Sequence, residues 1–389
     1  MSLRFLTAGE SHGPALTAIL EGIPAGLQLD ESIINLELTR RQKGYGAGPR
    51  MKIEQDAVQI LSGVMAGETI GSPIAFIIEN ADHKNWQGKD IDPMTTLRPG
   101  HADLTGAVKY GYRDLRPSLE RASARETTMR VAVGAVCKHF LAQFGIKVGG
   151  YVSEIGNIKA EFKDSNFEGR YQAAENSDVR CPDPEVAEMM RRHIKETIKN
   201  RDTAGGVIEI FVINLPAGLG SFGQWDTRLE AQLAQAVLSV QAIKGLEIGT
   251  AFENTKNLGS KVQDEIRLEN EMLVRPTNRA GGIEGGISNG QSIIIRAAMK
   301  PIATTLTPQM TVDLATGEES PTVYERSDFC PVPRAVPILE AMVSYVIADN
   351  LIQKLGGDSL DEMKPRFDLL RKACLRDLPM DNQTHRWWG

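Results

Sequence analysis

Two histidines stand in loops rich in glycine and proline, where a titratable ring could meet a ligand. His12 lies in GESHGP at residues 9–14, and His101 lies in RPGHAD at residues 98–103. Histidine has an ordinary pKa of about 6.5 and exchanges protons near neutral pH, and glycine lets the backbone approach a ligand closely. An incidental turn histidine is the plainer interpretation of either loop alone. Together the loops favour acid–base chemistry, and without an HxH or HxxxH pair they predict no metal site.

A third segment, LERASARETT at residues 119–128, combines a helix start with two arginines. Ser123 and Glu126 have the spacing of a capping box. The free N–H groups and positive dipole end of that helix, together with Arg121 and Arg125, would form an anion site. A well-capped helix alone is the plainer alternative, and the two interpretations are compatible.

The segment 40–52, RRQKGYGAGPRMK, carries five positive charges and no acid. It is either a solvated loop or a mobile flap that closes on an anionic substrate. The segment 325–328, ERSD, is by itself most simply a surface ion pair. The glycine-rich segment 281–286, GGIEGG, does not match GxGxxG, and the chain has no Walker A motif, so neither standard nucleotide loop is predicted.

Strands and helices alternate along the chain and must position these loops. Alternating or continuous apolar patterns predict strands at 16–21, 58–63, 73–79, 206–213 and 292–298. Helical periodicity predicts helices at 31–42, 123–144, 184–200, 227–241 and 336–355. The polar stretch 157–183 is expected to be a surface excursion.

A repeated sequence pattern suggests two related β/α halves packed into one domain. IPAGL at 23–27 follows a strand and precedes a helix, and LPAGL at 215–219 does the same. Each is followed by a glycine-punctuated β segment, at 67–74 and 286–293. Chance matches of this length are common, so the alternative of no repeat stays open.

Composition excludes several classes of protein. The 389 residues are 41% hydrophobic and 24% charged, which is typical of a globular chain. The net charge of −6 argues against a nucleic-acid partner. No apolar run approaches the roughly 20 residues of a membrane helix, and the N-terminus has no signal-peptide pattern. Four widely spaced cysteines fit a reducing compartment, so a cytoplasmic location is expected.

Taken together, these loops resemble the signatures of the chorismate synthase family. GESHG at 9–13 resembles the first signature, and E-x-x-S-A-R-x-T at 120–127 resembles the second. Arg326-Ser327-Asp328, followed by Arg334 and Pro337, resembles the third. The segments 98–103 and 281–290 also fit. The resemblance covers residues 1–355 as a single domain and leaves 356–389 as a C-terminal helix and tail.

The resemblance implies an enzyme that removes phosphate and a ring hydrogen from 5-enolpyruvylshikimate 3-phosphate to give chorismate, for aromatic amino-acid biosynthesis. It implies reduced FMN as the cofactor, acting as an electron relay, although the reaction is redox-neutral overall. It implies an α+β fold, a β-α-β sandwich whose central helices are flanked by antiparallel sheets with an internal pseudo-two-fold repeat, and a homotetramer. The alternatives are an NAD(P)H-dependent flavin oxidoreductase and an RNA-binding protein that uses the 40–52 segment.

Catalytic roles also follow from the resemblance. His12 would protonate or stabilise the leaving phosphate, and His101 would balance charge on the reduced flavin. Asp328, helped by Ser11 and Ser123, would accept a proton near the flavin N5. The substrate's carboxylates and phosphate would be held by Arg41, Arg50, Arg98, Arg125 and Arg326. The cofactor would contact Arg121, Ala122, Ser123, Gln241, Ala242, Gly285, Lys300, Pro301, Ile302, Ala303, Thr304 and Arg326.

Two positions depart from the family pattern. Ala47 stands in the glycine-rich segment where many relatives have an arginine, which weakens the case for a nucleotide contact there. Gln241-Ala242 replaces an Asn-Ala pair but keeps the amide. The compact chain lacks the long insertions of members that reduce their own flavin, so an external flavin reductant is expected.

Overall fold

Two antiparallel sheets form the framework of the protein. The computed structural model describes residues 2–47, 55–162, 166–325 and 327–388. The first sheet has the order β1-β2-β6-β3, with β1 (Arg4–Ala8), β2 (Ala15–Glu21), β6 (Ile74–Glu79) and β3 (Gln59–Ser62). The second has the order β10-β15-β9-β7-β8, with β10 (Ile243–Ile248), β15 (Ile293–Met299), β9 (Gly206–Ile213), β7 (Lys147–Ile155) and β8 (Ile158–Lys159).

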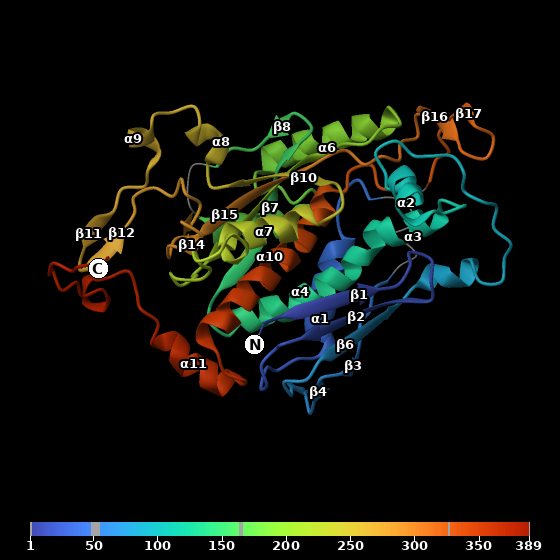
Figure 1. Ribbon diagram of the computed structural model, residues 1–389. Helices are drawn as coiled ribbons and strands as arrows, with labels where there is room; N and C mark the ends of the chain where they lie inside the picture. The colour runs from blue at the N-terminus through green and yellow to red at the C-terminus, as the bar shows by residue number, and fades with distance from the viewer. Residues whose placement is uncertain (1, 48–54, 163–165, 326, 389) are drawn as a thin grey trace.

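Four helices pack in the core beside these sheets (Figure 1). They are α1 (Glu31–Gln42), α4 (Thr127–Ala142), α7 (Leu229–Leu238) and α10 (Val332–Leu355). Helix α4 contacts strands β1, β2 and β6 of the first sheet and packs along α10, which contacts β7 and β9 of the second. All five predicted strands and the predicted helices are confirmed within a few residues, because long periodic patterns specify a buried face.

Smaller elements surround this core. The helices are α2 (Asp103–Tyr110), α3 (Arg116–Ala122), α5 (Phe167–Glu175), α6 (Pro184–Lys199), α8 (Ala251–Asn254), α9 (Gly259–Val262) and α11 (Leu360–Asp368), with 3₁₀ turns η2 (Ala81–Asn85), η3 (Ala124–Glu126), η4 (Trp225–Thr227) and η5 (Leu375–Asp377). Four hairpins pair β4 (Val64–Met65) with β5 (Glu68–Thr69), β11 (Arg267–Glu269) with β12 (Met272–Val274), β13 (Ile283–Glu284) with β14 (Ile287–Ser288), and β16 (Met310–Asp313) with β17 (Glu318–Pro321).

The expectation of a surface excursion at 157–183 is wrong in its second half. Helix α5 packs on β7, and Phe167, Ala174 and Cys181 are buried. Glu175 at the end of α5 also forms a two-pronged hydrogen-bonded ion pair with Arg40 of α1. A stretch with a polar sequence can be buried here because charged side chains such as Glu175 are paired inside the protein.

Helix α10 is apolar on nearly all sides because it lies in the core between α4, α7 and the second sheet. Among the described residues it is the one helix with the length and composition to cross a membrane, and most of it is buried inside the protein. All four cysteines are buried and free.

The contact between α4 and α10 depends on a glycine. A Cβ at Gly134 would lie 2.2 Å from the Cβ and 2.4 Å from the Cα of Ala341. Gly134→Ala is therefore expected to destabilise the protein by about 1–3 kcal/mol, despite the better helix propensity of alanine. Urea unfolding measures the change. Gly259→Ala in α9 is the control, because an added methyl group there would meet nothing within 4 Å and stability should stay within about 0.5 kcal/mol of wild type; equal stability of the two variants would contradict the close packing.

Candidate active site

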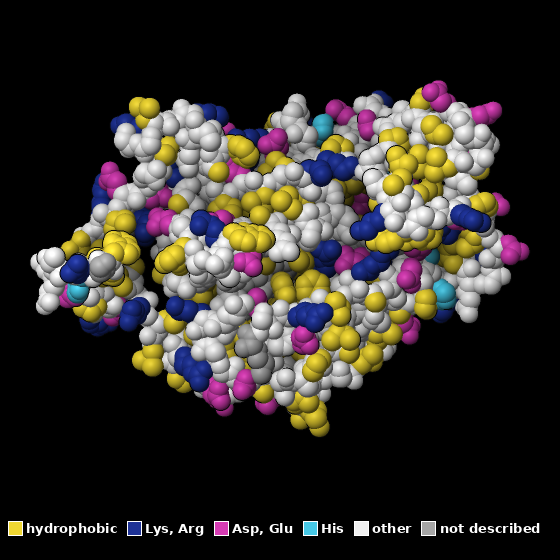
Figure 2. Space-filling model, in the orientation of Figure 1, with side chains coloured by type: hydrophobic (Ala, Val, Ile, Leu, Met, Phe, Trp, Pro, Cys, Tyr) yellow, Lys and Arg dark blue, Asp and Glu magenta, His cyan; other side chains and the backbone are white. Residues whose placement is uncertain are grey.

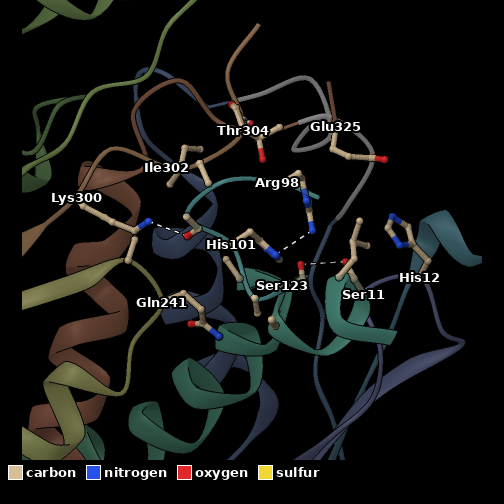
Figure 3. A pocket seen from close by; sticks show the side chains of 18 of the residues that line it. Ser11, His12, Arg98, His101, Ser123, Gln241, Lys300, Ile302, Thr304 and Glu325 are labelled. Atoms are coloured by element: carbon tan, nitrogen blue, oxygen red, sulfur yellow. Dashed lines mark hydrogen bonds between the residues drawn. The ribbon is translucent and has the colours of Figure 1, made fainter. Parts of the chain in front are cut away.

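A cavity of about 460 Å³ brings together loops that are far apart in the sequence (Figure 3). Its volume is in the range of small-molecule sites. The predicted site residues that line it are Ser11, His12, Arg98, His101, Ala122, Ser123, Gln241, Ala242, Lys300, Ile302, Ala303 and Thr304. Both histidines singled out from the sequence thus face one cavity.

His12 is held by Glu120, which begins the second family signature but was given no role from the sequence. Its Nδ1 lies 2.7 Å from Oε1 of Glu120, and its backbone N–H donates to Oε2 of the same side chain at 2.8 Å. Burial opposes ionisation of Glu120, but the hydrogen bonds from His12 lower its pKa below the ordinary value. The ionised carboxylate accepts only, so Nδ1 carries the proton and Nε2 is the nitrogen left for a ligand.

His101 is held in the same way by Asp103, which is fully buried. The His101 Nδ1 lies 2.7 Å from Oδ1 of Asp103, and Arg98 donates to both carboxylate oxygens at 2.7 Å. Burial disfavours the charged form, yet the bonds from Arg98 and His101 lower the pKa of Asp103 well below its usual range. The Arg98 Nη2 also lies 2.9 Å from the His101 Nδ1, so Arg98, His101 and Asp103 form one connected cluster at the cavity lining.

Ser11 and Ser123 meet between the two histidines (Figure 3), with their hydroxyl oxygens 3.1 Å apart. Ser123 caps the turn η3 by accepting from the Arg125 backbone N–H at 3.3 Å. The predicted capping box forms only in this half. The Glu126 carboxylate instead accepts from Thr7 at 2.8 Å and pairs with Arg130 at 2.9 Å.

Two more of the predicted arginines, Arg41 and Arg125, form a cluster behind Ser123. Arg125 pairs with the buried Asp56, and Arg41 lies 3.6 Å from the same carboxylate. Arg41 also donates to the carbonyl of Ala124 at 2.9 Å. Burial, together with the charge of Arg334, lowers the pKa of Arg41 to about 9. Arg40 and Arg41 lie in α1 and are buried, so the idea of a flap is wrong for this end of the segment: ion pairs and hydrogen bonds fix both side chains.

Asp328 joins this cluster from the other side. It forms an ion pair with Arg334, and the Arg334 Nε donates to the carbonyl of Arg41 at 3.2 Å. Both partners of the pair are largely buried, with side-chain exposures of 17% for Asp328 and 11% for Arg334. Ser327 lines the cavity, and Asp328 is the next residue.

Some predicted positions lie elsewhere. The Arg121 guanidinium donates to the carbonyl of Thr7 at 2.9 Å, outside the cavity lining, and Gly285 lies in the turn between β13 and β14. Pro301 is next to the lining residues Lys300 and Ile302. Arg50 and Arg326, with the rest of 48–54, lie outside the described residues.

Comparison with known proteins gives a consistent result. The family model described as chorismate synthase matches residues 3–352. The chain belongs to the chorismate synthase family. The chorismate synthase of Aquifex aeolicus is 52% identical over 94% of this chain and 96% of its own length, and that of Geobacter metallireducens is 51% identical over 94% and 98%. A crystal structure of chorismate synthase superposes with a TM-score of 0.79 at 46% identity, covering 95% of this chain and 97% of the other.

Chorismate synthase activity, that of a lyase acting on a phosphate ester, is the function these matches support, and a separate flavin oxidoreductase is not favoured. The mixed helix-and-sheet architecture is shared with the solved chorismate synthase. The family uses reduced FMN.

Sequence reasoning missed the acidic partners of the site. Glu120, Asp103, Asp82 and Asp56 each face a histidine or arginine named above. Only Asp103 had a local signal, two residues after His101. The others lie between 15 and 108 residues from their partners along the chain, so spacing could not connect them.

Proposed function

We propose that this cavity binds reduced FMN and 5-enolpyruvylshikimate 3-phosphate together and catalyses the 1,4-elimination that gives chorismate. The observation that carries the proposal is the pair of histidines, each fixed through Nδ1 by a carboxylate, on the lining of one cavity. Such an arrangement leaves two Nε2 atoms for proton exchange with ligands.

The lining fits a flavin. Leu119, Ala122, Ala242 and Ile302 supply apolar surface for a ring system. The Oε1 atom of Gln241 is buried without a partner among the described residues, as expected of an acceptor waiting for a ligand N–H. Bound reduced FMN would supply electron density as phosphate leaves and recover it as the ring hydrogen leaves. By position, the backbone from Lys300 to Thr304 would hold it.

The cations suit the substrate, which carries one phosphate and two carboxylates. Arg98 lines the cavity, and Arg41 and Arg125 stand directly behind Ser123 and Ala124. Guanidinium groups bind such anions through paired hydrogen bonds. His12 would give the proton of Nε2 to an oxygen of the departing phosphate, and Asp328 would accept the ring proton, with Ser11 and Ser123 bridging.

The decisive assay is anaerobic phosphate release from 5-enolpyruvylshikimate 3-phosphate. We expect turnover with chemically reduced FMN and none with oxidised FMN, whether or not NADPH is added, because an external reductant is proposed. Turnover with oxidised FMN and NADPH would instead show that the chain reduces its own flavin. No phosphate release under any condition would contradict the proposed function.

We also infer that the fold is a β-α-β sandwich built from two pseudo-two-fold-related halves. The support is a repeated hydrogen-bond pattern. In the first half the Thr69 hydroxyl donates to the carbonyl of Pro24 at 2.6 Å and accepts from the Leu27 N–H at 3.0 Å. In the second half the Ser288 hydroxyl donates to Pro216 at 2.7 Å and accepts from Leu219 at 2.9 Å.

Glycines with similar positive φ angles stand at corresponding positions in the two halves. Gly26 and Gly218 have φ of 86° and 96°, and Gly71 and Gly290 have φ of 77° and 90°. These conformations favour glycine. We propose that residues 1–355 form one domain, with α11 and the tail completing 356–389. If the halves depend on each other, separate expression of residues 1–200 and 201–389 will give insoluble fragments, and a soluble folded half would contradict this.

We propose a homotetramer and a cytoplasmic location for the enzyme. The outward face of the first sheet exposes Leu6, Ile19 and Leu61, and hydrophobic atoms gather where this sheet reaches the surface (Figure 2). An apolar sheet face of this kind suits contact with a second copy of the chain. Light scattering should give four times the 42.6 kDa chain mass. Free, buried cysteines suit a reducing compartment.

A further inference from the structure

The ring of His12 is enclosed by three side chains from two other elements. Glu120 of α3 holds Nδ1 at 2.7 Å. Trp86, which follows η2, lies against the ring with centroids 4.3 Å apart. Asp82 of η2 places Oδ2 4.0 Å from Nε2 and lines the cavity. Each ring nitrogen therefore faces a carboxylate, and the Trp86 ring packs against the His12 ring at a tilt of 42°.

We propose that Glu120 is a positioning residue that orients the His12 ring, with Nε2 directed into the cavity beside Asp82, and that its carboxylate supports His12 as a proton donor. The proposal rests on the proposed function, in which this Nε2–H supplies the proton for the departing phosphate. No new bond to the protein is formed. The proton moves from Nε2 to a phosphate oxygen, and the electron pair of the breaking C–O bond leaves with the phosphate.

Glu120 contacts both the backbone and the side chain of the loop that carries Ser11 and His12. Its two carboxylate oxygens hold the ring and the backbone N–H of His12, and its carbonyl accepts from the Ser11 N–H at 3.2 Å. These three contacts fix both the backbone and the side-chain rotation of the proton donor. They also couple His12 to the end of α3, where Ser123 stands opposite Ser11. A positioned donor loses little entropy on the way to the transition state.

Charged side chains surround the His12 ring. Glu120 and Asp82 are negative and close, and both are largely buried, with side-chain exposures of 13% and 8%. Among the described residues, Arg116 brings a positive charge to this side and lies over the Trp86 ring at 5.6 Å. His83 contacts the His12 carbonyl at 2.9 Å, and Glu10 lies in the same loop beside Gly13. Nearby carboxylates stabilise an imidazolium, so removing one should make His12 lose its proton at lower pH.

The test is Glu120→Gln in the full-length protein, with reduced FMN and 5-enolpyruvylshikimate 3-phosphate. Glutamine keeps the shape but loses the charge and can hold only one of the two N–H groups with its oxygen. We expect kcat to fall about 10²-fold with KM little changed. The alkaline limb of the pH–kcat profile should move to lower pH than in wild type, because the proton-donating form of His12 loses a stabilising carboxylate.

NMR titration of the His12 ring provides a readout independent of turnover. We expect the ring to lose its proton at lower pH in Glu120→Gln than in wild type, because the neighbouring negative charge is removed. Asp381→Asn is the matched control, because Asp381 pairs with His385 at 3.0 Å in the exposed tail. It should change neither the His12 titration nor kcat. His12→Ala combined with Glu120→Gln should lose no more activity than His12→Ala alone.

The outcomes separate this proposal from the proposed function. An active wild-type enzyme with an unchanged pH limb and His12 titration in Glu120→Gln overturns the role of Glu120 and leaves the function standing. A wild-type protein without phosphate release overturns the function, and the difference in NMR titration between wild type and Glu120→Gln then still decides whether the Glu120 carboxylate acts on His12. If Glu120→Gln fails to fold, Glu120→Asp, which keeps the charge on a shorter stem, should show a normal His12 titration with reduced kcat; a lowered titration in that variant would contradict the proposal.

Discussion

His101→Ala is expected to lower kcat by about 10²–10⁴-fold, the usual cost of removing an acid–base group from a site. The structure supports an effect in this range because His101 lines the cavity while its Nδ1 is fixed by Asp103. The mutation removes the ring but leaves the Arg98–Asp103 pair intact. The fold should therefore survive, and substrate affinity should change less than the rate.

Steady-state phosphate release with reduced FMN measures this effect, with FMN binding and thermal unfolding recorded on the same samples. His385→Ala is the control, since that histidine lies in the exposed tail. Asp103→Asn is the informative companion, because it keeps His101 and removes the carboxylate that orients it. Near wild-type turnover in a folded His101→Ala enzyme would remove this histidine from the mechanism.

Much of the framework follows from the sequence, because the long apolar patterns describe buried faces. The apolar run of α10 predicts that helix, and the β-branched stretches of β9 and β15 predict those strands. Helix α3 has no such signal. It is seven residues long, starts with Arg116-Pro117 and buries only Ser118 and Leu119, so it has no clear periodic face. Its position is set by contacts with the loop before β2, which no local pattern encodes.

The sequence predicts the cations, the histidines and Asp328 of the candidate site, but not the carboxylates that hold the histidines and arginines in place. Loops rich in glycine with His12 and His101 are unusual enough to be noticed in one sequence. Glu120 looks like an ordinary helical acid, and Asp56 like a surface one, until the fold buries them against His12 and Arg125. Burial turns a weak surface pair into a strong positional constraint, and burial is a property of the tertiary structure.

Asp328→Asn is expected to lower kcat on the order of 10²-fold or more, with FMN and substrate still bound. An exposed ion pair would contribute only about 0–1 kcal/mol, so its loss would change little. The Asp328–Arg334 pair is not exposed, and it connects through Arg334 to the backbone of Arg41. Asparagine nearly matches the shape of aspartate but cannot take a proton. If Asp328 is the proton acceptor, the substitution should therefore lower kcat.

Arg334→Gln distinguishes this role from a structural one. It breaks the same ion pair but keeps the Asp328 carboxylate. If Asp328 accepts the ring proton, Asp328→Asn will lose mainly kcat, whereas Arg334→Gln will raise KM more than it lowers kcat, because Arg334 supports the arginine cluster at Arg41. Both constants are measured for both variants under anaerobic conditions. Equal losses of kcat would mean that the pair acts as one structural unit, and the proton acceptor would then have to be sought among the residues that line the cavity.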